Sequence, residues 1–391
     1  MQHIPQTELN HRRDTLRRRL VDMGADACII TTPVNLFYLT GCIFDGFLYI
    51  PHEADPVQFI KRPAGITGDR TAAIRKPEQL PELLPRYGLS TPRILLAETE
   101  QLPYSDILRL VKALGNPELK SATALLRAIR SIKSEWELEQ MRQCARIQAE
   151  VYREIPSLYR QGMRDIDFQI EVEYLMRRKG SLGIFRAYGN NMDIFMGNVL
   201  TGENAQTASP FDFSMGGGGL SPYLPIGASG IPIREGMTVM FDMAGNYTPL
   251  QSDMSRTFSV GKVAQIAYDA HQVSIDICSR IEAVAKAGTS CAALYEDALA
   301  TAERHGLRAY FMGTVQQAKF IGHGIGLEIN EPPVLTPRSK ELLQPGMTIA
   351  VEPKFVLPGI GAVGIENSYI VHSENLEKIT LCQEKMLPLH S

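Results

Sequence analysis

The chain has 391 residues, of which 44% are hydrophobic, and its formal net charge is −3. A chain of this length is too long for one small core, so we expect two domains. The small negative charge argues against a nucleic-acid-binding protein, which would need a large basic surface.

The first predicted element is an amphipathic helix at residues 9–23. Leu9, Leu16 and Leu20 recur there at helical spacing. Gly24 is typical of the residue that ends such a helix. Residues 27–31 form a short run of strand-favouring residues, and helix–strand alternation continues to about residue 126. We therefore expect an N-terminal α/β domain.

Ser134 and Glu137 form a capping box, which indicates the start of a helix. A domain boundary just before this helix fits the length of the chain. We therefore predict an N-terminal domain of residues 1–130 and a C-terminal catalytic domain of residues 131–391.

The C-terminal part contains both helix and strand patterns. Helical stripes are predicted around residues 273–284 and 294–302, and strands at 238–244, 256–260, 347–351 and 363–371. The strands are too many for a helical bundle, and the helices are too long for a β-sandwich. An α/β or α+β domain follows.

Two acids in this part stand at the ends of predicted strands. Asp242 closes one apolar run, and Asp253 opens the next strand eleven residues later. This spacing suits two strands of a hairpin, which would bring both carboxylates together at one end.

Three further residues share the same apolar setting. His323 lies between Gly322 and Gly324, so its backbone can approach another segment closely. Glu352 ends the apolar run 347–351, and Glu366 lies in the glycine-containing run 361–366.

Each of these five residues alone has an ordinary structural explanation, such as a turn cap, a core histidine or a surface glutamate. Together they would place four carboxylates in apolar surroundings, which is costly unless cations neutralise them. Two divalent metal ions would balance this charge, and oxygen ligands with one imidazole suit Mn, Co, Zn or Fe.

The order of these motifs resembles the pita-bread metallopeptidases, which include Xaa-Pro aminopeptidase, Xaa-Pro dipeptidase (prolidase) and creatinase. The matching runs are residues 240–242, 252–258, 322–328, 346–353 and 364–367. Residues 35–41 resemble the N-terminal domain signature of this family, and residues 129–134 resemble its interdomain joint. The resemblance implies a creatinase-like α/β domain followed by a pita-bread α+β domain that binds metal.

The resemblance also implies roles for the five residues. Asp253 and Glu366 would bridge two metals, Asp242 would complete the ligands of one metal, and His323 and Glu352 those of the other. A hydroxide that bridges the two ions would attack a peptide carbonyl. Glu352 would also transfer the proton. A homodimer is implied as well.

The sequence departs from the peptidase pattern at two accessory histidines. No histidine occurs between His52 and His271, and the position seven residues after His323 is Asn330. Asn330 could still donate one hydrogen bond to the substrate as a catalytic residue. The expected activity is that of an Xaa-Pro aminopeptidase or dipeptidase. The alternatives are a metal-dependent hydrolase or lyase of a small molecule, and a binding protein with weak catalysis.

The N-terminus lacks an apolar signal core, and six scattered cysteines indicate reduced thiols. The most apolar region, residues 29–50, is interrupted by polar residues and proline, so it does not predict a membrane span. We therefore expect a cytoplasmic protein that binds a small peptide or another small molecule, without nucleic-acid or membrane partners.

Overall fold

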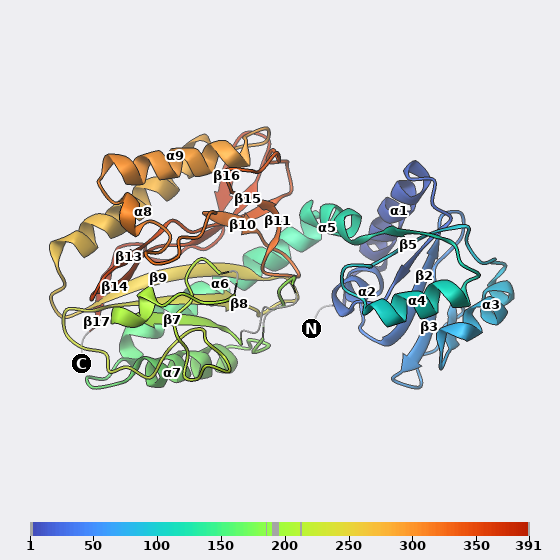
Figure 1. The fold of residues 1–391 in the computed structure, drawn as a ribbon, viewed down its shortest axis with the longest axis horizontal. Coiled ribbons are helices and arrows are strands. Elements are labelled where there is room, and N and C mark those ends of the chain that lie inside the picture. Colours follow the sequence, from blue (N-terminus) through green and yellow to red (C-terminus); the bar gives the residue numbers. More distant parts are fainter. Residues whose placement is uncertain (1–2, 185, 190–194, 212, 390–391) are drawn as a thin grey trace. The chain divides into compact units, whose positions relative to one another are not determined.

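The computed structural model describes residues 3–184, 186–189, 195–211 and 213–389. The chain divides into two compact units, Met1–Arg130 and Ser131–Ser391 (Figure 1). Each unit has its own buried apolar core.

The first unit is built on a mixed sheet with the strand order β4-β3-β2-β1-β5-β6 in its described residues. The strands are β1 (Ala27–Ile30), β2 (Asp45–Pro51), β3 (Val57–Arg62), β4 (Thr71–Ala73), β5 (Ile94–Ala97) and β6 (Glu118–Ser121). The helices are α1 (Gln6–Asp22), α2 (Pro33–Thr40), α3 (Leu80–Leu83), α4 (Tyr104–Ala113) and α5 (Thr123–Ser131), with the 3₁₀ turns η1 (Pro77–Gln79) and η2 (Leu84–Tyr87). The predicted first helix and first strand are both present, and the α/β class is confirmed.

A buried carboxylate, Glu98, joins the end of β5 to the start of α2. The backbone N–H groups of Thr31 and Thr32 donate to Glu98 Oε2 at 2.7 and 2.9 Å, and Asn35 Nδ2 donates to Oε1 at 2.7 Å. Arg130 Nη1 in turn donates to Asn35 Oδ1 at 2.7 Å. Asn35, the first residue of the run 35–41, is therefore polar because it links Glu98 to Arg130.

The second unit contains more strands and longer helices. Its helices are α6 (Glu135–Leu158), α7 (Asp165–Arg178), α8 (Gln265–Val284) and α9 (Cys291–Arg304), with the 3₁₀ turns η3 (Gly202–Gln206) and η4 (Arg308–Tyr310). Its strands are β7 (Gly197–Thr201), β8 (Thr238–Gly245), β9 (Ser252–Val260), β10 (Gly322–Gly324), β11 (Glu331–Val334), β12 (Thr348–Val351), β13 (Lys354–Leu357), β14 (Gly361–Gly364), β15 (Asn367–Val371), β16 (Leu376–Lys378) and β17 (Leu387–Leu389).

The strands of this unit form a central layer between two pairs of helices (Figure 1). One sheet has the order β17-β9-β8-β7 and packs on α6 and α7. Another has the order β11-β10-β12-β15-β16, and with the β13–β14 hairpin it lies under α8 and α9. The candidate site residues discussed below lie where these strands meet.

The helix predicted from the capping box is confirmed. Ser134 Oγ accepts a hydrogen bond from the Glu137 N–H at 3.3 Å, and Glu137 Oε2 accepts one from the Ser134 N–H at 3.0 Å. The two bonds satisfy N–H groups at the start of α6 that have no partner inside the helix.

The prediction of one continuous strand over residues 363–371 is wrong. The strand is interrupted between β14 and β15, where the Glu366 N–H donates to the Ser255 carbonyl of β9 at 3.2 Å. Pairing with a different strand redirects the chain at this point. The apolar character of the run continues across the break because both strands are buried.

In the described part of the chain, none of the helices combines the length and the apolar character needed to cross a membrane.

Candidate metal centre

Asp242 and Asp253 lie on the hairpin of β8 and β9. In its antiparallel register Asp242 is opposite Ser255, and Asp253 is opposite Ala244. Ser255 lies two residues after Asp253, so the two acidic side chains leave the same face of the hairpin. Asp253 is buried and Asp242 is half-buried. The predicted hairpin is present, and it brings both carboxylates to one face.

His323 is the middle residue of β10. A Cβ atom at Gly322 would collide with the Ala350 carbonyl oxygen, and one at Gly324 with that of Pro332. The flanking glycines therefore allow neighbouring backbone to approach. His323 Nδ1 lies 3.0 Å from the Gly324 carbonyl oxygen, which can only accept a hydrogen bond. Nδ1 must then carry a proton, and in the neutral imidazole Nε2 presents a lone pair.

Glu352 and Glu366 are both buried. Glu352 directly follows β12, and its N–H donates to the Ile321 carbonyl at 2.8 Å. Glu366 lies in the break between β14 and β15, where Ser255 Oγ donates to its Oε2 atom at 2.7 Å. These contacts fix the backbone of Glu352 and the carboxylate of Glu366 against neighbouring segments.

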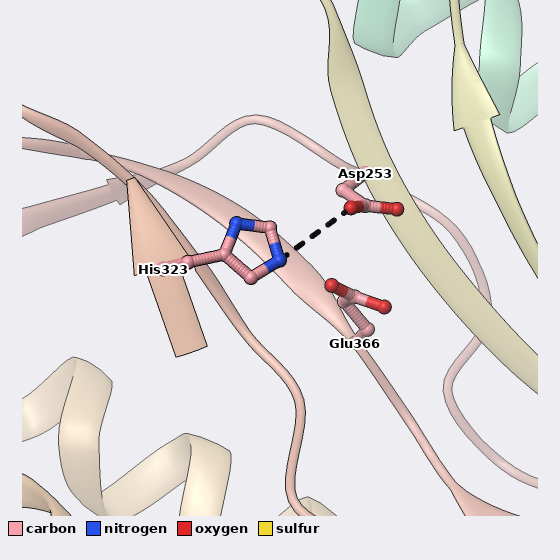
Figure 2. Close-up of side chains that lie close together, drawn as sticks. All are labelled: Asp253, His323 and Glu366. Atoms are coloured by element: carbon pink, nitrogen blue, oxygen red, sulfur yellow. Dashed lines mark ion pairs between the residues drawn. The ribbon is translucent and has the colours of Figure 1, made fainter. Parts of the chain in front are cut away.

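The five side chains come together in two overlapping groups. Ligand atoms of Asp253, His323 and Glu366 all lie within 4.8 Å of one another, as shown in Figure 2. Ligand atoms of Asp242, Glu352 and Glu366 form a second group within the same limit. His323 Nε2 lies 3.8 Å from Asp253 Oδ2 and 3.6 Å from Glu352 Oε1, so Glu352 adjoins the first group as well.

Lys354 was not predicted to contribute to the site, yet its ammonium lies inside the second group. The nitrogen Nζ is 2.8 Å from Asp242 Oδ2, 2.7 Å from Glu352 Oε2 and 3.0 Å from Glu366 Oε2. Its side chain is completely buried. Glu352 and Lys354 are two residues apart in an extended segment, and this spacing directs both side chains to the same side.

Burial and the neighbouring charges shift the pKa values of this cluster, upward for Asp253, Glu366 and Lys354 and downward for Asp242. Burial raises the pKa of Glu366 and Asp253 well above their usual values, and repulsion from neighbouring carboxylates adds to the effect. Burial would also raise the pKa of Asp242, but the attraction of Lys354 outweighs it and holds the pKa below its usual value. Burial would lower the pKa of Lys354, but attraction to Asp242, Glu352 and Glu366 raises it well above its usual value.

The first group has the properties of a divalent metal site. Glu366 Oε1 is buried and has no hydrogen-bond partner among the described residues. The Glu366 carboxylate lies in one group with the imidazole of His323 and the carboxylate of Asp253. Buried acceptors without a donor are costly, and a cation would satisfy them. Two carboxylates and one imidazole suit Mn, Co, Zn or Fe.

Asn330 has contacts of a different kind. Its Oδ1 atom accepts a hydrogen bond from the Tyr188 N–H at 2.7 Å, and its Nδ2 donates to the Tyr188 carbonyl at 2.8 Å. These paired contacts fasten the segment around Tyr188 to the start of β11. The amide thus has a structural function, and its contact with a substrate stays a prediction.

A cavity of about 340 Å³ adjoins the carboxylate cluster. It is lined mainly by residues 205–209, 213–216 and 316–320, and its described lining contains no carboxylate. Ser214 belongs to this lining, and its hydroxyl lies 3.2 Å from Lys354 Nζ. The volume is that of a small-molecule pocket.

Comparison with known proteins assigns both units. Residues 139–373 match metallopeptidase family M24, and residues 12–132 match the creatinase/prolidase N-terminal domain. These matches cover most of the chain, and they confirm the predicted combination of a creatinase-like N-terminal domain with a pita-bread domain.

Individual relatives are distant but similar in length. An uncharacterised peptidase of Bacillus subtilis is 26% identical, and the match covers 96% of this chain and 99% of that protein. An Xaa-Pro dipeptidase of Pyrococcus furiosus is 23% identical, with 97% and 100% covered. The solved structure of an Xaa-Pro dipeptidase from Bacillus anthracis superposes with a TM-score of 0.79 at 24% identity, covering 97% of this chain and all of that one.

Proposed function

Because the chain belongs to metallopeptidase family M24, we propose that it is a metal-dependent peptidase that hydrolyses short Xaa-Pro peptides. One observation carries this proposal. The buried oxygen Glu366 Oε1 has no donor among the described residues, and the Glu366 carboxylate forms one group with Asp253 and His323, which together could hold a divalent ion.

A divalent ion held by Asp253, His323 and Glu366 would lower the pKa of a bound water and thereby supply a nucleophile near neutral pH. Glu352 Oε1, which lies 3.6 Å from His323 Nε2, is the nearest candidate to accept the proton. Its other oxygen, Oε2, is held by Lys354, so the carboxylate has a fixed orientation.

The substrate would enter the cavity lined by Ser214, Phe320 and their neighbours. The lining offers neutral polar side chains, aromatic rings and one lysine, Lys319, which suit a short peptide. The Xaa-Pro preference rests on the distant relatives whose names carry that activity. The homodimer and the cytoplasmic location stay predictions from the sequence.

A second candidate function is the hydrolysis or lysis of a small molecule that is not a peptide. Two observations favour it. No histidine occurs between His52 and His271, and the amide of Asn330 is already bound to the Tyr188 backbone. A peptidase that lacks oxyanion contacts loses about 10²–10³-fold in rate for each.

A substrate panel would separate the two functions. The full chain, loaded separately with Mn²⁺, Co²⁺, Zn²⁺ or Fe²⁺, would be assayed on Xaa-Pro dipeptides, longer Xaa-Pro peptides, and small amide and guanidino compounds. We expect slow but metal-dependent cleavage of Xaa-Pro peptides, below the enzyme median of about 10 per second. Turnover only of the small compounds would contradict the peptidase proposal and support the second function.

A further inference from the structure

Lys354 supplies a positive charge inside the carboxylate group of Asp242, Glu352 and Glu366. Each carboxylate has an oxygen 2.7 to 3.0 Å from Nζ, which is the distance of a charge-assisted hydrogen bond. An ammonium has three N–H bonds, and these three carboxylate oxygens are its nearest acceptors, while Ser214 Oγ lies farther away at 3.2 Å. This group of ligands is therefore already occupied by a cation of the chain itself.

A divalent ion and the ammonium cannot share this position. A metal would approach the same oxygens to about 2.0–2.2 Å. It would then lie against Nζ, because both cations would sit at the centre of the same three oxygens. Two positive charges in contact inside a buried site repel strongly.

The backbone fixes the position from which the Lys354 side chain extends. Lys354 begins β13, where it is paired with Gly364 of β14, and its carbonyl accepts a hydrogen bond from the Met312 N–H at 2.9 Å. The whole side chain is buried, so an ammonium that left the carboxylates would lose its partners while still enclosed by protein.

The other group of ligands remains open to a metal. It consists of Asp253, His323 and Glu366, with Glu352 Oε1 beside His323 Nε2, and the Oε1 atom of Glu366 has no hydrogen-bond partner among the described residues. Lys354 contacts the other oxygens of Glu352 and Glu366, namely their Oε2 atoms. Each of these two glutamates thus holds the ammonium through its Oε2 atom and leaves its Oε1 atom for a metal.

We propose that the centre binds a single divalent metal ion at Asp253, His323, Glu352 and Glu366, and that the Lys354 ammonium takes the second cation position. Asp242 is then a partner of Lys354 and not a metal ligand. This inference deepens the proposed function and rests on its metal dependence. It replaces the expectation of two metals with one metal and one fixed charge.

Metal stoichiometry tests the proposal on the full chain. The protein would be stripped with a chelator and titrated with Mn²⁺ alone, with bound metal measured by calorimetry and elemental analysis. We expect about one Mn²⁺ per chain, whereas a two-metal site would take about two. Electron paramagnetic resonance should show an isolated ion and not an exchange-coupled pair.

Substitution of the lysine should open the second position. Lys354→Met keeps the unbranched side chain up to Cε but removes the ammonium, and it should raise the stoichiometry from about one to about two. Lys133→Met is the matched control, because Lys133 is equally buried but pairs with Glu331 outside the cluster, 3.0 Å away. The control should still bind about one ion.

A second variant keeps the test valid if Lys354→Met does not fold. Asp242→Asn removes one partner of Lys354 but no ligand of the proposed single ion, so the stoichiometry should stay at about one. Binding of two ions by the wild type, reduced to one in Asp242→Asn, would overturn the inference while leaving the metal-dependent function intact. Absence of any Mn²⁺ binding by the wild type would contradict both.

Discussion

The two units bury carboxylates in different ways. Glu98 in the first unit is completely enclosed, and donors from Thr31, Thr32 and Asn35 reach both of its oxygens. Glu366 in the second unit is almost as buried, yet one of its oxygens has no donor among the described residues. Its other oxygen is shared by Ser255 and the ammonium of Lys354.

This difference separates a structural acid, Glu98, from a proposed metal ligand, Glu366. Neutral donors from the backbone and side chains of two connected segments satisfy Glu98 without any added ion. The four acids of the Glu366 cluster lie close together, and the single positive charge of Lys354 leaves part of their negative charge unbalanced. A site that needs an external cation to complete it is suited to bind one.

Substitution of Glu366 should give the largest effect. Glu366→Gln removes a charged ligand, so we expect weaker Mn²⁺ binding and a loss in kcat/KM on the order of 10³-fold. The metal-free variant should unfold at no lower temperature than the metal-free wild type, because an acid whose pKa is raised by burial and by Asp253 is removed.

Fluorescence of Trp136, the single tryptophan of the chain, would follow unfolding of the second unit. Wild-type Mn²⁺ affinity in Glu366→Gln would contradict the assignment of this residue as a ligand.

A pH titration should give the next largest effect, again in the second unit. Burial lowers the pKa of His271 to about 4, and its ring accepts from the Gly364 N–H and contacts the Glu384 carbonyl. The unfolded chain therefore binds the proton first, and stability is lost as the pH falls from about 6.5 to about 4. The loss from this residue is roughly 3 kcal/mol.

The measurement is urea unfolding followed by Trp136 fluorescence at pH 7 and pH 4.5. His271→Gln should be less stable at pH 7 but should lose less stability on acidification than the wild type. An equal loss in both proteins would show that other groups cause the pH dependence.

Substitution of Glu98 should give the smallest of these effects and should be confined to the first unit. Glu98→Gln replaces one carboxylate oxygen, an acceptor, by an NH₂ donor. This should lower the free energy of unfolding of the first unit by about 1–3 kcal/mol. Hydrogen exchange at the amides of Thr31 and Thr32 should accelerate, while the Trp136 transition and Mn²⁺ stoichiometry stay unchanged. A change in Mn²⁺ binding by Glu98→Gln would contradict the view that Glu98 is structural and that, of these two acids, only Glu366 binds metal.

Much of this arrangement could be predicted from the sequence. The capping box at Ser134 fixes the start of α6, and the spacing of Asp242 and Asp253 predicts the β8–β9 hairpin. The order of the motifs along the chain also indicated the five residues that cluster in the structure, namely Asp242, Asp253, His323, Glu352 and Glu366. These features depend on local spacing, which the sequence displays directly.

The remaining features depend on contacts between distant segments. The partner of Asn330 is the backbone of Tyr188, which no local pattern reveals. The break at Glu366 follows from its bond to Ser255 in another strand. Lys354 is an intermediate case, because strand alternation places it on the same side as Glu352, but its three partners become evident only in the folded chain.

A crystal structure of the Mn²⁺-loaded full chain, with an anomalous difference map at the manganese edge, tests the central claim most directly. The account predicts one peak among Asp253, His323, Glu352 and Glu366, with Lys354 Nζ still bound to Asp242. Two peaks, with the lysine displaced from the carboxylates, would contradict the single-ion centre. No peak at the cluster would contradict its role as a metal site.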